Sequence, residues 1–345
     1  MSWLDDDDDD DLDYEADIRV RPNPKANRPR TKRRPAHADA QIARVLGVDR
    51  GRYTVLIDED GPHERQILAT RARELRKQPI VNGDRARVVG DTTGDDGTLA
   101  RIVGIEERTS LLRRSADDTD QVERVIVANA EQLLIVVAAA DPEPRPRLVD
   151  RYLIAALDAG MQPLLVVTKT DLADPASFLA HFEGLDDLEV FTSGRDQMPV
   201  AEIGARLAGH ATVFVGHSGV GKSTLVNALV PDAARATGHV NEVTGRGRHT
   251  SSSAVSLRYV GDDGRGWVID TPGVRSFGLG HVDPANILRA YTDLAAIAEE
   301  CPRGCTHLPD APDCAIIEAV AEGRLGERGP ARLDSLQRLL ATFAT

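Results

Sequence analysis

Residues 211–224 read ATVFVGHSGVGKST, an apolar run that leads into a glycine-rich turn and a lysine. Its last part, 216–224, fits the pattern G-x-x-x-x-G-K-S/T, whose glycines let backbone N–H groups face phosphate oxygens. In this pattern Lys222 would reach the β- and γ-phosphates of a nucleotide, and the Ser223 hydroxyl would bind Mg²⁺. The apolar run predicts a buried strand, and 224–229 predicts a helix. The pattern therefore lies between a strand and a helix, as a phosphate-binding loop requires. A plain glycine-rich turn is the alternative interpretation. The residues of the loop are Gly216, His217, Ser218, Gly219, Val220, Gly221, Lys222, Ser223 and Thr224.

A second motif follows the predicted strand 163–167 and consists of Thr168, Lys169, Thr170 and Asp171. The Asp171 carboxylate can accept hydrogen bonds from the N1–H and exocyclic amine of guanine, while the Lys169 stem packs along the ring. Adenine lacks that pair of donors and would leave the carboxylate unpaired. Four residues alone are equally compatible with a surface turn.

A third motif, Asp270-Thr271-Pro272-Gly273, follows the predicted strand 266–269. Asp270 can bind the Mg²⁺ shell, and the Gly273 N–H can contact a γ-phosphate. Parallel α/β sheets bind ligands at the carboxyl ends of their strands, so three such motifs together predict a guanine-nucleotide site. The guanine motif precedes the phosphate loop along the chain, which predicts a circularly permuted arrangement.

Composition places this chain of 345 residues among globular proteins of two or three domains, with 41% hydrophobic and 28% charged residues. The longest apolar run, 133–140, is far shorter than the roughly 20 residues of a membrane span. The first residues lack the pattern of a secretory signal. We therefore expect a cytoplasmic protein without a membrane partner.

The first 36 residues carry opposite charge blocks, although the net charge of the chain is −13. Residues 1–17 contain ten acidic residues and no basic one, whereas 18–35 contain eight basic residues and no acidic one. Such a stretch buries too little apolar surface to fold, so we expect 1–36 to be disordered. It is either a solubilising tail or a basic arm for nucleic acid that the acidic block masks.

The remaining chain predicts three further domains. Residues 37–112 show short alternating runs separated by Asp60-Gly61, Asn82-Gly83 and Asp96-Gly97, which predicts hairpins and an OB-type β-barrel. Such barrels often bind oligonucleotides, so we expect this domain to bind RNA, although small barrels also have other uses. Strands and helices alternate over 113–281, which predicts the α/β nucleotide-binding domain. The last domain, 282–345, is predicted to be helical.

The three cysteines of the chain all lie within this last domain. Cys301, Cys305, His307 and Cys314 follow the spacing C-x3-C-x-H-x6-C. Three sulfurs and one imidazole form a closed tetrahedral zinc site, which is structural. Buried free thiols are the alternative.

The order of the motifs, with the flanking barrel and the cysteine cluster, resembles the small-ribosomal-subunit-dependent GTPase A family, also called RsgA, YjeQ or EngC. The resemblance covers roughly 38–320. The matching segments are 126–129 (IVAN), 149–153 (VDRYL), 216–224, 247–250 (GRHT) and 270–274. It implies an OB domain, a circularly permuted GTPase domain, a C-terminal zinc-binding domain and a role in late assembly of the 30S subunit.

The chain departs from the family pattern at several positions. Thr168 replaces the commoner asparagine, but its hydroxyl can still donate locally. Residues 250–252 read TSS where the family has a threonine run, and Thr250 keeps the hydroxyl suited to Mg²⁺ and γ-phosphate sensing. The cysteine gaps of three and six residues differ from the usual four and five. Residues 191–193 would form a further part of the guanine-binding side of the site, but we assign no contact with the base to them.

Hydrolysis requires a water molecule in line with the γ-phosphate. Many GTPases have a glutamine directly after the third motif, but Val274 cannot orient water. His249, beside Thr250, resembles the histidine to which the family assigns this role, so we expect it to be catalytic; a solvated loop histidine is the alternative. Because that glutamine is missing, we expect slow intrinsic turnover and activation by a partner.

The sequence thus predicts a monomeric GTPase that hydrolyses GTP to GDP and phosphate and assists late maturation of the 30S subunit. The expected partners are the 30S subunit with its 16S rRNA and GTP or GDP, and the expected ions are one structural Zn²⁺ and Mg²⁺ with GTP. The alternatives are a permuted GTPase that serves another RNA particle, and an RNA-binding scaffold whose nucleotide site only regulates docking.

Overall fold

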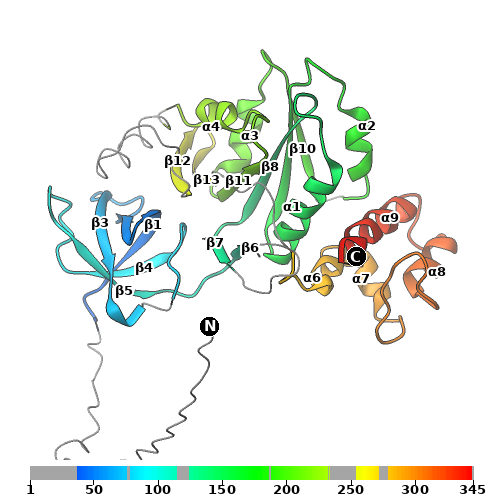
Figure 1. Ribbon diagram of the computed structural model, residues 1–345, viewed down its shortest axis with the longest axis horizontal. Coiled ribbons are helices and arrows are strands. Elements are labelled where there is room, and N and C mark those ends of the chain that lie inside the picture. The colour runs from blue at the N-terminus through cyan, green and yellow to red at the C-terminus, as the bar shows by residue number, and fades with distance from the viewer. Residues whose placement is uncertain are drawn as a thin grey trace, which may run out of the picture. The chain divides into compact units, whose positions relative to one another are not determined.

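The first five strands close into a small barrel, seen in blue to cyan in Figure 1. They are β1 (Gln41–Asp49), β2 (Arg52–Ile57), β3 (Arg65–Arg71), β4 (Arg85–Val89) and β5 (Ala100–Ile105). Antiparallel pairs join β1 to β2, β2 to β3 and β5 to β4, while β3 and β5 run parallel and β4 returns to β1. Every second side chain points inward, and Val45, Val55 and Ile102 are completely buried. The expected OB-type barrel is confirmed.

One of the three expected hairpin turns is not a hairpin turn. Asp60-Gly61 lies between β2 and β3, and Asp96-Gly97 lies between β4 and β5, as predicted. Asn82-Gly83 instead follows a 3₁₀ turn (Arg73–Leu75) and precedes β4, which does not pair with β3. A Cβ atom on Gly83 would lie 1.9 Å from the Ala128 carbonyl oxygen, so glycine permits the close approach of another segment here.

The computed structural model describes the segments 37–75, 78–114, 124–185, 188–231, 233, 254–271 and 279–343. The charged tail 1–36 therefore lies outside the described residues. The described residues from Asp39 onward form one compact unit. A two-stranded sheet, β6 (Leu111–Arg114) and β7 (Arg124–Ala128), follows the barrel.

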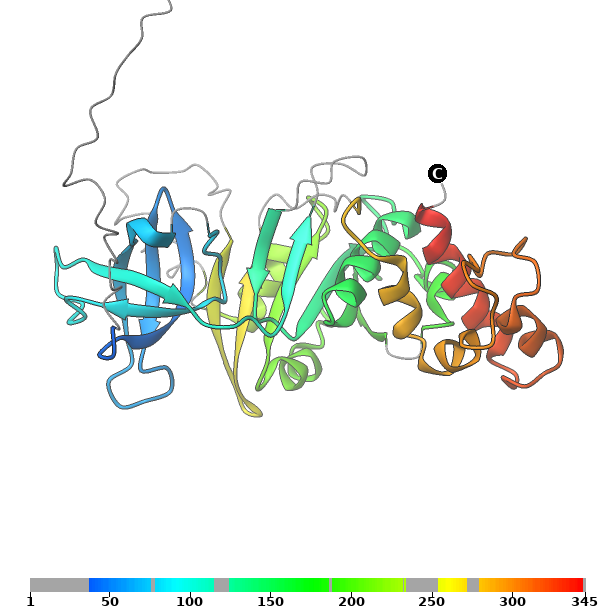
Figure 2. The same cartoon turned by 90° about the horizontal axis from the view of Figure 1, so that it is seen from below.

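The central sheet has five parallel strands in the order β10-β9-β8-β11-β13. Their bounds are Gln132–Ala138 (β8), Gln162–Thr168 (β9), Glu189–Ser193 (β10), Ala211–Gly216 (β11) and Gly264–Asp270 (β13). The antiparallel β12 (Val255–Gly261) lies beside β13 and also pairs with barrel strand β1 at Gly47↔Val255. Figure 2 shows β12 and β13, in yellow, next to the blue barrel strands. The barrel and the central sheet are thus one continuous sheet.

Helices cover both faces of the central sheet. Leu133 and Ile135 of β8 pack on the side of α1 (Pro146–Asp158), whereas Leu134 and Val136 pack on the side of α3 (Val200–Leu207) and α4 (Lys222–Leu229). This alternation is what a strand buried on both faces requires. A short helix α2 (Ala176–Leu179) with a 3₁₀ turn (Ala180–Phe182) connects β9 to β10. None of the helices in the described ranges is long and apolar enough to span a bilayer.

The C-terminal segment is helical, as predicted. Its helices are α6 (Pro284–Arg289), α7 (Thr292–Ala298), α8 (Ala315–Ala321) and α9 (Gly329–Leu340), followed by a 3₁₀ turn (Ala341–Phe343). The Asp283 side chain accepts a 2.9 Å hydrogen bond from the Ala285 N–H and so caps α6. Buried Tyr291 and Leu336 belong to the same hydrophobic cluster as Tyr152 of α1. These helices therefore share a core with one face of the central sheet.

Candidate functional site

The loop between β11 and α4 has the tight backbone that its glycines predict. Gly221 precedes the first turn of α4 in a left-handed conformation, with φ of 90°, which a residue with a side chain rarely adopts. A Cβ atom on Gly216 would lie 2.5 Å from the Val136 carbonyl oxygen, so the loop begins in close contact with β8. The loop leads directly into the N-terminus of α4, whose free N–H groups and dipole favour an anion.

Lys222 and Asp270 form an ion pair at the carboxyl ends of two neighbouring strands. The Lys222 ammonium donates to the Asp270 carboxylate, although the two residues come from different motifs. Next to them, the Thr271 hydroxyl donates a 2.8 Å hydrogen bond to the Phe214 carbonyl of β11. The structure thus brings the phosphate motif and the third motif together at one edge of the sheet.

The guanine motif contacts the phosphate loop directly. The buried Thr168 hydroxyl donates to the Val220 carbonyl oxygen at 2.6 Å, and the Val137 carbonyl oxygen lies 3.2 Å away. Thr168 therefore donates locally, as expected for the residue in the place of asparagine. Lys169 has a φ of 57°, and its ammonium donates to the carbonyl oxygen of Asp141.

Asp171 is exposed, and its carboxylate is oriented from the side of β10. The backbone N–H of Arg195 donates a 3.0 Å hydrogen bond to Asp171 Oδ1. The Thr170 N–H donates to the Ser193 carbonyl oxygen at 3.2 Å. The sequence motifs did not predict Arg195 or Asp141 as site residues. The parallel register that pairs Ser193 with Thr168 brings Arg195 here, and this register is not visible in a local motif.

Three predicted site residues cannot be located. His249, Thr250 and Gly273 lie outside the described residues, as does Val274. Their expected roles stay predictions.

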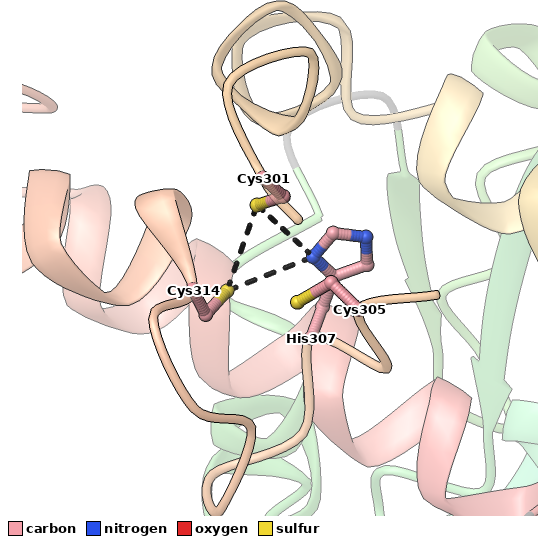
Figure 3. A group of neighbouring side chains, drawn as sticks. All are labelled: Cys301, Cys305, His307 and Cys314. Atoms are coloured by element: carbon pink, nitrogen blue, oxygen red, sulfur yellow. Dashed lines mark hydrogen bonds between the residues drawn. The ribbon is translucent and has the colours of Figure 1, made fainter. Parts of the chain in front are cut away.

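The four expected metal ligands converge in the C-terminal segment, as Figure 3 shows. Cys301 follows α7, Cys305 and His307 lie in the loop after it, and buried Cys314 precedes α8. The Sγ atom of Cys301 lies 3.7 Å from His307 Nδ1 and 4.0 Å from Cys314 Sγ. Cys314 Sγ lies 3.6 Å from His307 Nδ1, and all four ligand atoms lie within 4.8 Å of one another.

The three distances of 3.6–4.0 Å among Cys301, His307 and Cys314 are close to those around one tetrahedral ion, and Cys305 Sγ lies within 4.8 Å of the other three ligand atoms. Zinc–ligand bonds of about 2.3 Å to sulfur and about 2.0 Å to nitrogen require ligand atoms roughly 3.5–3.8 Å apart. Burial lowers the pKa of His307, which favours the neutral imidazole that ligates a metal. The Gln337 amide of α9 donates a 3.0 Å hydrogen bond to the His307 carbonyl oxygen and so fixes the loop. The cluster can hold a metal ion despite its shorter first gap.

Comparisons with known proteins agree with this geometry. The family model described as RsgA GTPase matches residues 105–280. A protein of Vibrio vulnificus strain YJ016 named small ribosomal subunit biogenesis GTPase RsgA 1 is 36% identical over 274 residues, 77% of this chain and 75% of the relative. A protein of Azotobacter vinelandii named small ribosomal subunit biogenesis GTPase RsgA is 35% identical over 292 residues, 83% of this chain and 81% of the relative.

Solved structures show the same architecture. The crystal structure of YjeQ from Thermotoga maritima superposes with a TM-score of 0.63 at 25% identity, over 88% of this chain and 99% of that chain. A structure titled as that of YloQ, a circularly permuted GTPase, gives a TM-score of 0.61 at 24% identity, over 90% and 98% of the two chains. The second likeness shows the fold alone.

Proposed function

This chain belongs to the RsgA GTPase family, and we propose that it is a ribosome-associated GTPase that assists late maturation of the small ribosomal subunit. The observation that carries the proposal is the convergence of Lys222, Asp270 and the guanine motif at the carboxyl edge of one sheet. A site built from strand ends does not depend on chain order, so the permutation preserves the chemistry. The substrate is GTP, and the products are GDP and phosphate.

Each residue at this edge has a chemical task in the proposal. Residues 216–224 surround the phosphates, Lys222 neutralises the β- and γ-phosphates, and Asp171 selects guanine. With GTP bound, the Lys222 ammonium, which now pairs with Asp270, would contact phosphate, and the Asp270 carboxylate would help to hold Mg²⁺. The Ser223 hydroxyl would also ligate Mg²⁺.

Three further roles rest on the sequence. Thr250 completes the Mg²⁺ shell, the Gly273 N–H contacts the γ-phosphate, and His249 orients the attacking water. Because Val274 cannot orient water, intrinsic turnover is slow and the ribosomal particle accelerates it.

The cysteine cluster holds one structural Zn²⁺ in the proposal, since Cys301, Cys305, His307 and Cys314 leave no open position for a substrate. The barrel contacts 16S rRNA within the 30S subunit. The protein acts as a monomer in the cytoplasm and has no membrane partner.

The deciding experiment is GTP hydrolysis measured with and without purified 30S subunits. We expect strong stimulation, and Lys222→Ala to abolish it together with nucleotide binding. Binding to 30S subunits without stimulated turnover would instead support a scaffold whose nucleotide site regulates docking. Stimulation by another RNA particle, but not by 30S subunits, would reassign the partner.

A further inference from the structure

Thr168 ends β9 and opens the guanine motif, yet its side chain contacts the phosphate loop. Its hydroxyl oxygen lies 2.6 Å from the Val220 carbonyl oxygen and 3.2 Å from the Val137 carbonyl oxygen, and the residue is buried. A hydroxyl group has a single hydrogen to donate. Thr168 therefore uses this hydrogen on the main chain, and the shorter of the two distances assigns it to Val220.

The contact with Val220 acts on the part of the backbone that would surround the phosphates. In a trans peptide the C=O and N–H groups point in opposite directions, so a fixed Val220 carbonyl also fixes the direction of the Gly221 N–H. A Cβ atom on Gly221 would lie 3.6 Å from Thr168 Oγ1, so the threonine side chain packs directly against this glycine. Gly221 precedes Lys222, which is expected to bind the β- and γ-phosphates. By its contacts, Thr168 belongs to the phosphate half of the site.

Guanine offers two chemically different edges to a protein. Its N1–H and exocyclic amine are donors, which the Asp171 carboxylate can accept, whereas O6 and N7 are acceptors and can be bound only by donors. The Lys169 ammonium already donates to the Asp141 carbonyl oxygen. Asparagine, the commoner residue of the family at position 168, has two amide hydrogens and can bind the phosphate loop and N7 together. Thr168, with one hydrogen, cannot do both.

We propose that Thr168 is a positioning residue for the phosphate loop and that N7 of guanine receives no hydrogen bond in this protein. The inference rests on the proposed GTPase function. Guanine is then selected through its N1–H and exocyclic amine, by Asp171. Replacement of N7 by carbon should therefore not weaken binding. Loss of the Thr168 hydroxyl should weaken the binding of the phosphates without changing the preference for guanine.

The first test is equilibrium binding of GTP and 7-deaza-GTP, in which a C–H group replaces N7, to the full chain. We expect wild type to bind the two nucleotides within about twofold of each other. Thr168→Asn supplies a second hydrogen and should prefer GTP by about 3- to 10-fold, the usual effect of one hydrogen bond. Thr168→Ser has a single hydrogen and should behave like wild type. Such a preference in wild type would overturn the inference, and so would its absence in a folded Thr168→Asn variant.

The second test compares GTP binding by Thr168→Val and Thr212→Val. Thr212 is the matched control, because it is also buried and its hydroxyl donates a 2.7 Å hydrogen bond to Gln132 Oε1. It lies near the start of β11, at the opposite end of that strand from the phosphate loop. We expect Thr168→Val to weaken GTP binding by about 5- to 50-fold, the usual range for a buried carbonyl left without a donor, and Thr212→Val to stay within about twofold. Thermal unfolding of both variants shows whether they fold.

ITP, whose base lacks the exocyclic amine, separates the two halves of the site. Thr168→Val should weaken GTP and ITP binding by the same factor, because the contact of Asp171 with the base is unaffected. A smaller preference for GTP over ITP, or equal losses in the two Thr→Val variants, would overturn the inference. If Thr168→Val does not fold, the binding of 7-deaza-GTP by wild type and Thr168→Ser decides.

Failure of the proposed function would look different. Wild-type protein that binds GTP but is not stimulated by 30S subunits would count against that function, while the binding criteria would still decide the role of Thr168.

Discussion

The indole N–H of Trp267 donates a 2.7 Å hydrogen bond to the carboxylate of Glu59, which joins β13 of the central sheet to the loop after barrel strand β2. The same carboxylate accepts from Arg44 at 2.8 Å. The guanidinium carbons of Arg258 and Arg44 lie 4.7 and 5.4 Å from the centre of the Trp267 ring. Glu59 is therefore the centre of a largely buried charged network between the barrel and the strand that ends at Asp270.

We predict that Glu59→Gln destabilises the protein by about 3 kcal/mol, because it removes the carboxylate that is hydrogen-bonded to the nearly buried Arg44 guanidinium. Chemical denaturation at pH 7 measures this change. Glu106→Gln is the control, since Glu106 forms an exposed pair with Arg87 at 3.6 Å and should cost less than about 1 kcal/mol. Equal costs for both variants would contradict the role of the network.

The contribution of Glu59 to the free energy of unfolding should depend on pH. Burial opposes the charge of Glu59, but Arg44, the Trp267 hydrogen bond and Arg85 outweigh it and lower the pKa of Glu59 below 4.5. A carboxyl whose pKa is lowered by folding stabilises the protein above its unfolded pKa and loses this contribution as the pH falls through the folded value. The difference between wild type and Glu59→Gln should therefore shrink below about pH 4.5.

We predict that Asp171→Asn weakens GTP binding by about 100-fold or more and improves binding of xanthosine triphosphate. The amide presents a donor where guanine also donates, so two charge-assisted hydrogen bonds are lost. Equilibrium binding of both nucleotides measures the switch. Asp174→Asn is the control, because Asp174 lies on the same loop and, among the hydrogen bonds of the described residues, its side chain accepts one from the Ala176 N–H at 2.9 Å. Equal loss of both nucleotides in Asp171→Asn would argue against the contact with the base.

We predict one zinc ion per chain and a marked fall in the melting temperature on its removal by a chelator. The binding energy of the metal is folding energy, and the loop that it organises is hydrogen-bonded to α9 through Gln337. Because α9 shares a core with α1, metal loss should also reduce amide-exchange protection in α1. Freshly purified protein without zinc, or α1 protection that is indifferent to the chelator, would contradict this prediction.

Local motifs predicted much of this molecule because their residues are close in sequence. The phosphate loop, the guanine motif and the cysteine cluster each depend on a short spacing, and the strand runs of the barrel depend on alternation. The contacts between these parts could not be predicted in the same way. Glu59 and Trp267 are 208 positions apart, and Asn82-Gly83 has the composition of a hairpin turn although it forms a joint between sheets.

We predict that His249→Ala keeps GTP affinity and 30S association but lowers stimulated hydrolysis by about 10²–10⁴-fold, the usual effect of removing a group that positions a proton or water. Single-turnover hydrolysis on saturating 30S subunits is the measurement. His210→Ala is the control, because His210 is an exposed histidine between α3 and β11, outside the three nucleotide motifs, with its ring Nδ1 2.9 Å from the Ala208 carbonyl oxygen. Near-normal stimulation of His249→Ala would transfer the role to the ribosome or to backbone groups.

The last prediction concerns Asp150 of α1, which faces Arg338 of α9 across the shared core. Asp150 is 3% exposed, and its Oδ1 lies 3.3 Å from Arg338 Nε. Burial raises the pKa of Asp150 from 3.8 to about 6, although the charges of Arg338, His181 and Arg147 act in the opposite direction. The folded protein thus binds this proton more tightly than the unfolded chain.

The stabilisation that results from this proton is complete below pH 3.8 and is lost as the pH rises through about 6. Asp150→Asn carries no such proton, so its free energy of unfolding relative to wild type should rise by about 1 kcal/mol between pH 5 and pH 8. Denaturant unfolding of both zinc-loaded proteins at the two pH values measures this difference. Parallel pH profiles would show that Arg338 compensates the buried charge fully and that Asp150 is ionised across the whole range.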